Sequence, residues 1–382
     1  MTIFGATSMA LGIALTAVIL TSHGAIELYF GTQMSRRRLA RWILVTTGFA
    51  LVLTAQSLVA SAYGDEQDTQ RLFWSLALLL LTWGASGIFA VRLSTCDHRS
   101  VDRLVTWGLW FLGANAALGL SGIIVVTYAS FKACGVFSEP SHLAMASAPF
   151  LLYATARRVR RCELVLASFF LWGLLIQNLT MLVVVILAAL PLIRLRLKVL
   201  LMLGVFVAMV AVVLGQSEPA IEYFRNRLVI DRSTDNLSVL VLLRGWEYAL
   251  QAIDISHGWG LGFQQFGVTY IGGDVLIKLQ TQGLGDQNLL DGGTAAAKIV
   301  GELGYVGIFL LVLYVLFAAR CMCDMRRASE GETPPWRTFL QAGVVGVSVE
   351  MFVRGAGYFT PNFFILFAAI SAAVIGLKRI NT

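Results

Sequence analysis

Long hydrophobic segments separated by short polar connections make up most of the chain. An apolar segment of about 20 residues can cross a bilayer as a helix, since each residue rises about 1.5 Å and the hydrocarbon core is about 30 Å thick. The first five expected spans cover residues 8–30, a stretch up to 62, residues 72–93, a stretch ending near 128 and a stretch reaching 157. The pattern therefore predicts an all-α integral membrane protein.

The apolar block at residues 164–193 is too long for one perpendicular helix, so we expect a helical hairpin that turns at Gln177 and Asn178. Basic residues after the hairpin open an eighth span. Three more spans are expected at residues 295–319, 336–352 and 360–377. The total is about eleven transmembrane helices, within a range of roughly 10–12.

One long polar stretch interrupts this pattern and divides the chain into three parts. Residues 1–214 are expected to form an N-terminal bundle of about eight spans. Residues 215–294 are expected to form a large loop, and residues 295–382 to supply about three C-terminal spans. If the protein carries out chemistry, this loop is the first place to look for it.

Within the loop, residues 237–255 have the periodicity of an amphipathic helix. Its polar stripe consists of Arg244, Glu247, Gln251 and Asp254. We expect such a helix to lie at the membrane interface with its stripe facing a cavity. Two interpretations of Arg244 stay open. It pairs with Glu247 on its own helix, or it binds phosphate oxygens, because a guanidinium offers a planar fork of donors.

The composition supports the membrane assignment. Hydrophobic residues make up 57% of the chain and charged residues only 13%, where soluble domains have about 25% charged residues. Most of the 29 Lys and Arg residues fall in one alternate set of connections, which the positive-inside rule assigns to the cytoplasm. This orientation puts the N-terminus and the long loop outside and explains the net charge of +7, so no nucleic-acid partner is expected. The five cysteines are scattered and predict neither a disulfide nor a metal site.

A minority of the cationic residues falls on the outer side, where positive charge is selected against. Arg354 lies four residues after Glu350, a spacing that favours an ion pair at the membrane edge. Lys298 and Glu302 are also four residues apart, and ionisable groups at that depth usually face a cavity or each other. With Arg232 of the loop, Arg354 and Lys298 are therefore candidates for binding an anion.

Candidate proton acceptors are few on the outer side. Glu139 directly precedes Pro140, a residue common at the first position of a helix. Glu139 is thus either a structural charge at the interface or a carboxylate at the mouth of the bundle, with His142 nearby, that accepts a hydroxyl proton. His257 is either a turn residue or a base. The acids of the loop, Asp291 among them, are too dispersed to predict a metal site.

Four segments of the chain carry distinct motifs. They read Arg244-Gly-Trp-Glu-Tyr-Ala-Leu-Gln-Ala-Ile, Gly258-Trp-Gly-Leu-Gly-Phe, Phe137-Ser-Glu-Pro-Ser-His and Lys298-Ile-Val-Gly-Glu-Leu-Gly-Tyr-Val-Gly. Together they resemble the bacterial O-antigen polymerase and ligase superfamily. The first two are similar to the family's periplasmic arginine helix and Gly-x-Gly turn, the third to the Glu-Pro motif of Wzy-type polymerases, and the fourth to the start of the helix after the loop.

The resemblance implies a GT-C-type glycosyltransferase that is inverting and metal-independent, without a cofactor. The expected donor and acceptor are undecaprenyl-pyrophosphate-linked oligosaccharides, used at the periplasmic face of the bacterial inner membrane. Membrane lipid and a chain-length regulator protein are further expected partners. The alternatives are an O-antigen ligase or other lipid-linked glycosyltransferase, and a flippase for the same substrate, although no internal symmetry typical of transporters is visible.

The expected roles follow from this chemistry. Arginine and lysine on the outer face would hold the pyrophosphate leaving group, and a carboxylate or imidazole would deprotonate the attacking hydroxyl. The expected pyrophosphate-binding residues are Arg244, Arg354, Arg232 and Lys298, the sugar-binding residues Asp291, Gln251 and Glu302, and the catalytic residues Glu139, His142 and His257. One departure weakens the ligase alternative. Ligases carry His-Asn before the helix that follows the loop, where this chain has Gly293 and Thr294.

Overall fold

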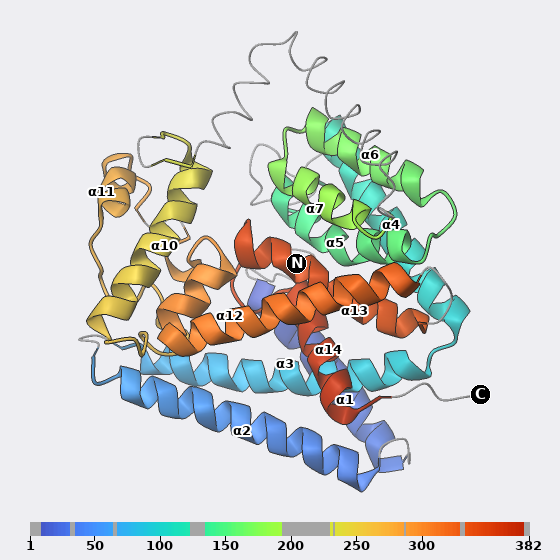
Figure 1. Ribbon diagram of the computed structural model, residues 1–382, viewed down its shortest axis with the longest axis horizontal. Helices are drawn as coiled ribbons and strands as arrows, with labels where there is room; N and C mark the ends of the chain where they lie inside the picture. The colour runs from blue at the N-terminus through green and yellow to red at the C-terminus, as the bar shows by residue number, and fades with distance from the viewer. Residues whose placement is uncertain are drawn as a thin grey trace.

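The computed structural model describes residues 9–30, 35–63, 67–122, 134–192, 230–231, 234–285, 288–328 and 333–377. Regular structure in these ranges is helical (Figure 1), apart from one isolated β-bridge between Cys134 and Phe137. The helices before the loop are α1 (Met9–Phe30), α2 (Arg36–Ala60), α3 (Thr69–Thr95), α4 (His98–Ser121), α5 (Pro140–Ala156), α6 (Cys162–Leu175) and α7 (Leu179–Ala189). The later helices are α10 (Leu237–Ile255), α11 (Asp274–Thr281), the short 3-10 helix η2 (Leu289–Asp291), α12 (Ala295–Ala328), α13 (Pro335–Phe352) and α14 (Pro361–Ile375). The helical fold class is confirmed for the described residues.

Four of the described helices, α2, α3, α4 and α12, are long and apolar enough to cross a membrane. Shorter apolar helices accompany them, among them α6, α7 and α14. Large apolar side chains point outward from α2, α4 and α12, for example Leu44, Trp107 and Leu316, which are 73%, 73% and 63% exposed. Water would disfavour so much exposed apolar surface, whereas lipid suits it. The structure thus agrees with a membrane protein.

The centre of the bundle is α13, most of whose residues are buried. It packs against α5, α12 and α14. The α5 and α13 helices are antiparallel, because Arg354 contacts Glu139 at one end of the pair and Arg157 donates to the Thr333 carbonyl at the other. The first of these ends carries connections predicted to be outside, and the second carries connections predicted to be inside.

The helical hairpin predicted for residues 164–193 is present as α6 and α7, which pack against each other. The chain turns at Gln177, which has a φ of 57°. With 14 and 11 residues, α6 and α7 are about 21 and 16 Å long, shorter than a hydrocarbon core of about 30 Å. A hairpin returns the chain to the side from which it came whether or not it crosses, so the predicted orientation does not depend on its depth.

Two predicted features lie outside the described residues, and one predicted helix is shorter than expected. The eighth span, after residue 194, and the first part of the long loop lie outside the described residues, so the total of about eleven spans stays a prediction. Arg232 also lies outside them. The fourth helix, expected to end near residue 128, ends at Ser121 because Gly122 adopts the left-handed conformation that terminates helices.

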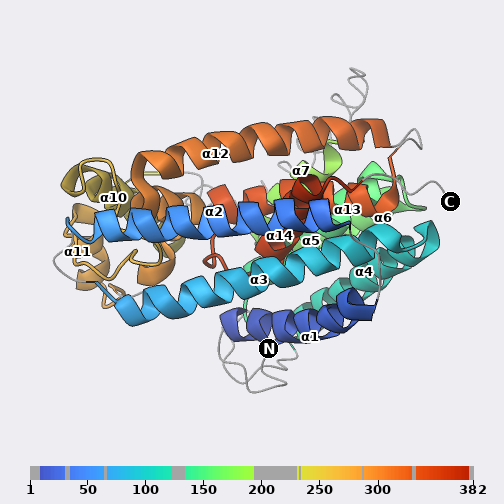
Figure 2. The ribbon, with the colours of Figure 1, turned by 90° about the horizontal axis from the view of Figure 1, so that it is seen from below.

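The described part of the long loop gathers at one end of the bundle. Both views place α10 and α11 there, beside the start of α12 (Figures 1 and 2). The α10 helix covers residues 237–255, as predicted, and begins where the Asn236 side chain accepts the N–H groups of Ser238 and Val239. The loop therefore folds onto the ends of the helices at one side of the bundle, the side predicted to be outside.

Candidate functional site

The α12 helix is broken at Gly304, at the end of the bundle where the loop packs. Gly304 has φ 57° and ψ −132°, a backbone conformation that favours glycine. The break leaves carbonyl groups of the turn that precedes it without helical partners. The N–H groups of Leu261 and Gly262 donate to the Gly301 and Glu302 carbonyls at 3.0 and 2.9 Å. The loop thus completes the hydrogen bonding that the helix loses.

The glycine-rich turn at residues 258–262 is shaped to fit this break. Its three glycines have φ values of 91°, 76° and 99°. A Cβ on Gly260 would lie 2.4 Å from the Glu302 carbonyl oxygen, and the Tyr305 N–H donates to the Gly258 carbonyl at 2.9 Å. Glycines let another chain segment or a ligand come close to the backbone. In the structure the backbone that approaches is that of α12.

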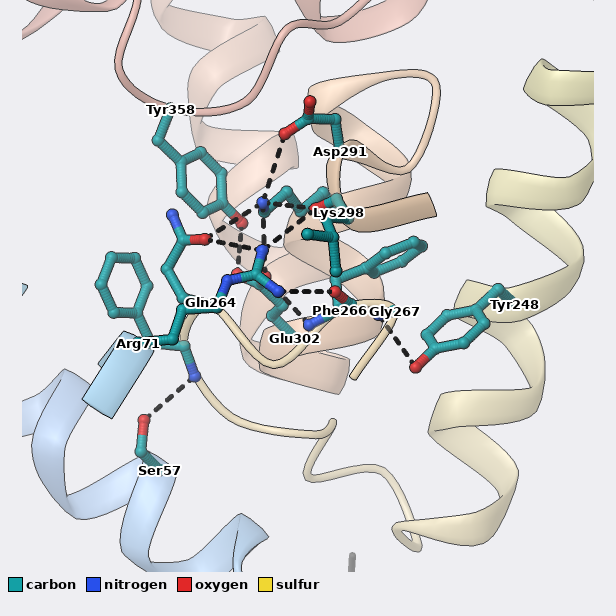
Figure 3. A network of polar contacts seen from close by, with 12 residues as sticks. Ser57, Arg71, Tyr248, Gln264, Phe266, Gly267, Asp291, Lys298, Glu302 and Tyr358 are labelled. Atoms are coloured by element: carbon teal, nitrogen blue, oxygen red, sulfur yellow. Dashed lines mark hydrogen bonds and ion pairs between the residues drawn. The ribbon is translucent and has the colours of Figure 1, made fainter. Parts of the chain in front are cut away.

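Lys298 and Glu302 lie one turn apart at the start of α12, in the middle of a polar network (Figure 3). Lys298 Nζ is 3.8 Å from Glu302 Oε1, and the two side chains are 1% and 0% exposed. Lys298 Nζ donates to the Leu290 carbonyl at 2.7 Å and to the Gln264 side-chain oxygen at 3.2 Å. Tyr358 donates its hydroxyl to Glu302 Oε2 at 2.8 Å. The pair predicted from the sequence spacing is present and is saturated by internal partners.

Arg71, in the first turn of α3, joins the same network (Figure 3). Its guanidinium donates to the Gln264 side chain at 3.3 Å and to the Leu290 carbonyl at 3.4 Å. Asp291 Oδ1 lies 3.8 Å from Lys298 Nζ. Two cations thus converge on the same two oxygens of the loop, with acids beside them. The network ties the loop to α3 and α12 and fixes one wall of the neighbouring cavity.

A polar cavity of about 480 Å³ opens beside this network. Residues from α1, α3, α5, the long loop, α12 and the connection after α13 line it. Besides Tyr358, its ionisable side chains are Glu139, His142, Asp291, Lys298 and Arg354. All five were candidate site residues in the sequence, so the fold brings them together from separate parts of the chain. Their chemical roles stay predictions.

A short ion pair spans one wall of the cavity. Arg354 Nη2 donates to Glu139 Oε2 at 2.7 Å, and the two side chains are 29% and 36% exposed. The Ser141 hydroxyl donates to the same Oε2 atom at 2.9 Å. One turn on, His142 Nδ1 lies 3.0 Å from the Ser138 hydroxyl. The start of α5 therefore presents a carboxylate and an imidazole to the cavity.

The surroundings of Glu139 decide its charge. Burial raises the pKa of its carboxyl, but Arg354, His142 and the hydrogen bonds from Ser141 and Arg354 outweigh burial and hold the pKa below 4.5. The carboxylate is therefore ionised at neutral pH, and it can accept either a proton or a hydrogen bond. As long as Arg354 holds it, however, it is a weak base.

The predicted pair between Glu350 and Arg354 is wrong. Glu350 is 2% exposed and accepts hydrogen bonds from the Thr360 hydroxyl at 2.6 Å and the Asn362 amide at 2.8 Å. Because α13 ends at Phe352, the helical spacing that would bring the two side chains together is lost before Arg354. Glu350 instead ties α13 to α14, which leaves Arg354 for Glu139.

The polar stripe of α10 does not line this cavity. Arg244 is 4% exposed and its Nη1 donates to the Gly285 carbonyl at 2.7 Å. Glu247 accepts the N–H of Val275 at 3.1 Å, at the start of α11. Gln251, on the same stripe, is likewise absent from the lining. In the described residues α10 turns Arg244 and Glu247 toward other parts of the loop, and the phosphate-binding role expected of Arg244 stays a prediction.

Two further candidates also stand apart. His257 lies in the turn after α10 with a φ of 49°, and its ring meets that of Tyr63 edge-on at 5.7 Å. This geometry agrees with the interpretation of His257 as a turn residue. Glu302 is fully buried and accepts the Tyr358 hydroxyl, so its carboxylate does not face the cavity in this structure, and its expected contact with a sugar stays a prediction. Glu302 anchors the wall of the cavity.

A second cavity, of about 330 Å³, lies further along α12 and is apolar. Its lining comes from α2, α3, α12, α13 and α14 and includes Leu53, Leu79, Leu310 and Phe363. Tyr358 lines both cavities. The two cavities thus lie next to each other and share the Tyr358 side chain as part of their walls.

Sequence reasoning missed Arg71 and Tyr358. Arg71 is a cation at the outer end of the third span, so the argument that singled out other outer cations applied to it equally. Tyr358 had no such signal, because its role comes from Lys298, 5.1 Å above its ring, and from Glu302. Burial and the Glu302 carboxylate raise the pKa of Tyr358 well above its usual value, so its hydroxyl stays protonated.

The side chains of the polar cavity suit an anionic or hydroxyl-bearing ligand. Arg354 offers charged donors, and Glu139 and Asp291 offer acceptors. Across the described residues, no group of three or more His, Cys, Asp or Glu side chains is placed to hold a metal ion.

Comparisons with known proteins add no family to this picture. Neither protein-family models, nor curated proteins, nor solved structures match the chain. A functional assignment therefore depends on the geometry of the two cavities and on the sequence motifs around them.

Proposed function

We propose that the protein polymerises undecaprenyl-pyrophosphate-linked oligosaccharide repeat units by inverting, metal-independent glycosyl transfer. The reaction takes place at the periplasmic face of the bacterial inner membrane. One lipid-linked chain is the donor, and a second lipid-linked repeat unit is the acceptor. This is the activity of Wzy-type polymerases of the GT-C class, which the motifs of the sequence resemble.

One observation carries the proposal. The Glu139 and Arg354 pair lies on the wall of a polar cavity, and an apolar cavity beside it shares the lining residue Tyr358. A lipid-linked sugar donor needs three things in one place: a cation for its pyrophosphate, an acceptor for the proton of the attacking hydroxyl, and apolar space for its lipid chain. The two cavities supply all three.

The reaction follows from these positions. Glu139 takes the proton of the acceptor hydroxyl, and the hydroxyl oxygen attacks the anomeric carbon of the donor sugar from the face opposite the pyrophosphate. The bond between that carbon and the phosphate oxygen breaks, and its electron pair leaves with the pyrophosphate. Arg354 stabilises the negative charge on the leaving group, which needs no proton because pyrophosphate is a stable anion.

The remaining side chains of the cavity support this reaction. Asp291 is 43% exposed, so its carboxylate can accept hydrogen bonds from sugar hydroxyls. Lys298 adds a positive charge to the field of the cavity, although its donors are used by Leu290 and Gln264. His142 is the second candidate for the base, because it shares the wall with Glu139.

Incubating the purified protein with lipid-linked repeat units tests the proposal. We expect a ladder of products on a gel from the natural protein and none from Glu139→Gln or Arg354→Gln, with membrane insertion unchanged. Asp254→Asn is the matched control, since it removes an acid from the loop outside the cavity. Transfer only to lipid A-core would identify a ligase, and flipping in liposomes without any transfer would identify a transporter. Either result would overturn polymerisation.

A further inference from the structure

We infer that Glu139 is an internal ligand of the anion site at Arg354, and that a phosphate-type anion must displace it in order to bind. This inference rests on the proposed function only in taking pyrophosphate as the natural anion. The new element is that the donor's pyrophosphate binds Arg354 in the same step in which Glu139, the proposed base, leaves Arg354. In the ligand-free protein the two groups that chemistry would need are occupied with each other.

The geometry of the pair supports an exchange. A single oxygen of Glu139, Oε2, accepts from both Arg354 and Ser141 at 2.7 and 2.9 Å. Carboxylate and phosphate oxygens have the same preference for the planar donors of a guanidinium. The Glu139 carboxylate therefore occupies the place where a phosphate oxygen would bind.

Exposure makes Arg354 the exchangeable cation of the cavity. Its side chain is 29% exposed, and it lies in the connection after α13. Lys298 is 1% exposed and donates to Leu290 and Gln264, so an incoming anion cannot take it without breaking the network. An ion pair that is about one-third exposed contributes little to stability, so a multiply charged diphosphate can replace it.

The exchange changes what Glu139 can do. Arg354 and Ser141 hold the carboxylate in its charged form, which weakens it as a base. When an anion takes Arg354, the carboxylate loses its strongest partner and gains a neighbouring negative charge, and both changes favour taking up a proton. Glu139 is thus ready to accept the hydroxyl proton only when a donor is bound, and it returns that proton to water after transfer.

Binding of inorganic pyrophosphate to the purified protein, measured by titration calorimetry, tests the exchange without any sugar substrate. We expect Glu139→Gln to bind pyrophosphate roughly three- to tenfold more tightly than the natural protein, because the competitor has lost its charge. Arg354→Gln should bind it more weakly. In the double variant the gain from Glu139→Gln should disappear, because the exchange requires both partners. Arg354→Met, which also removes the charge, replaces Arg354→Gln if the latter does not fold.

Two controls separate an exchange from a general effect of charge. Asp291→Asn removes an acid from the same cavity, and Asp254→Asn removes one from the loop outside it. We expect a smaller gain from the first and none from the second. The inference is overturned if Glu139→Gln binds pyrophosphate no more tightly than the natural protein, or if its gain persists without Arg354.

The outcome is independent of the polymerase assay. Tighter binding by Glu139→Gln, together with no ladder from the natural protein, would keep the exchange and reject the polymerase. A ladder from the natural protein, together with unchanged binding by Glu139→Gln, would keep the polymerase and reject the exchange. Misfolding cannot produce the expected result, since that result is a gain in affinity.

Discussion

Two ion pairs lie within one cavity region and are built in opposite ways. Lys298 and Glu302 are buried, 3.8 Å apart, and surrounded by Tyr358 and other internal partners. Glu139 and Arg354 are about one-third exposed and 2.7 Å apart. The distance between the charged atoms is longer in the buried pair, because Lys298 and Glu302 also bond to several other groups. In the exposed pair, Glu139 bonds to Arg354 and Ser141.

The difference separates a structural role from a chemical one. A buried charge that loses its partner has no water to replace it, so such a pair fixes a wall and does not exchange. A partly exposed pair costs little to open and can give up either partner to a ligand. The positions of the two pairs in the sequence suggest no such division, since both contain candidate binding residues.

The largest expected effect is on stability. Glu302→Leu leaves Lys298 buried without its fully buried carboxylate partner and removes the acceptor of the Tyr358 hydroxyl, and we expect it to lower the free energy of unfolding by about 3–5 kcal/mol. Glu139→Leu should lower it by no more than about 1 kcal/mol. Thermal unfolding in detergent measures both. Equal losses would contradict the division between the pairs, whereas partial recovery in Lys298→Met/Glu302→Leu would support it.

The next effect is on catalysis. Arg354→Gln should slow polymer formation by about 10²–10³-fold, the usual cost of removing one donor to a developing anion. Arg244→Gln should act mainly on stability, because Arg244 is buried against Gly285 and does not line the cavity. Initial rates and melting temperatures of the two variants check this. A larger loss of rate from Arg244→Gln than from Arg354→Gln, at unchanged stability, would instead support the pyrophosphate-binding role that the sequence predicted for Arg244.

A smaller difference concerns two glycines with positive φ, of which only Gly304 lies beside the buried pair. A Cβ at Gly304 would lie 1.9 Å from the Gly258 carbonyl oxygen, whereas a Cβ at Gly283 would meet nothing within 4 Å, although both residues have positive φ. Gly283→Ala should cost about 1–2 kcal/mol for the left-handed backbone alone. Gly304→Ala should cost more, because the loop must move away from α12. Melting temperatures that fall equally would argue against a tight contact between the turn and the broken helix.

The smallest expected effect is on pH dependence. The pKa of Glu139 lies below 4.5, so the stabilisation from its charged form is present above pH 4.5 and is lost as the pH falls through the lowered value. Ser141→Ala removes one of the hydrogen bonds that lower this pKa, so acid inactivation should begin at a higher pH. Polymer formation measured between about pH 3 and 6 checks the direction. Ser75→Ala, on the α3 wall of the cavity, should leave the profile unchanged.

Much of the fold could be predicted from local pattern. The apolar segments predicted the helices from α1 to α7 and from α12 to α14, and the periodicity of residues 237–255 predicted α10. The spacing of Lys298 and Glu302 predicted their pair, because a regular turn of helix places such residues side by side. Each of these predictions needed only information within a few residues.

The same reasoning failed where a contact depends on distant segments. Arg354 pairs with Glu139, 215 positions away in sequence, and not with Glu350. The reason is that α13 ends at Phe352, so the i,i+4 helical geometry that would bring Arg354 beside Glu350 is absent. The glycine-rich turn fits the break in α12, and neither segment indicates the other. Tyr358 lines both cavities because of how α2, α3, α12, α13 and α14 pack around the apolar one.

The sequence by itself determined that this protein is helical, apolar enough for a membrane, and charged mainly in its connections, because composition and period are local properties. It also supplied the side chains of the cavity. Only the tertiary structure decided which of them meet, which are saturated, and which can exchange partners. Whether a side chain is buried, and which partner it bonds, depends on helices that are far apart in sequence and pack together. These properties therefore cannot be derived from any single segment of the chain.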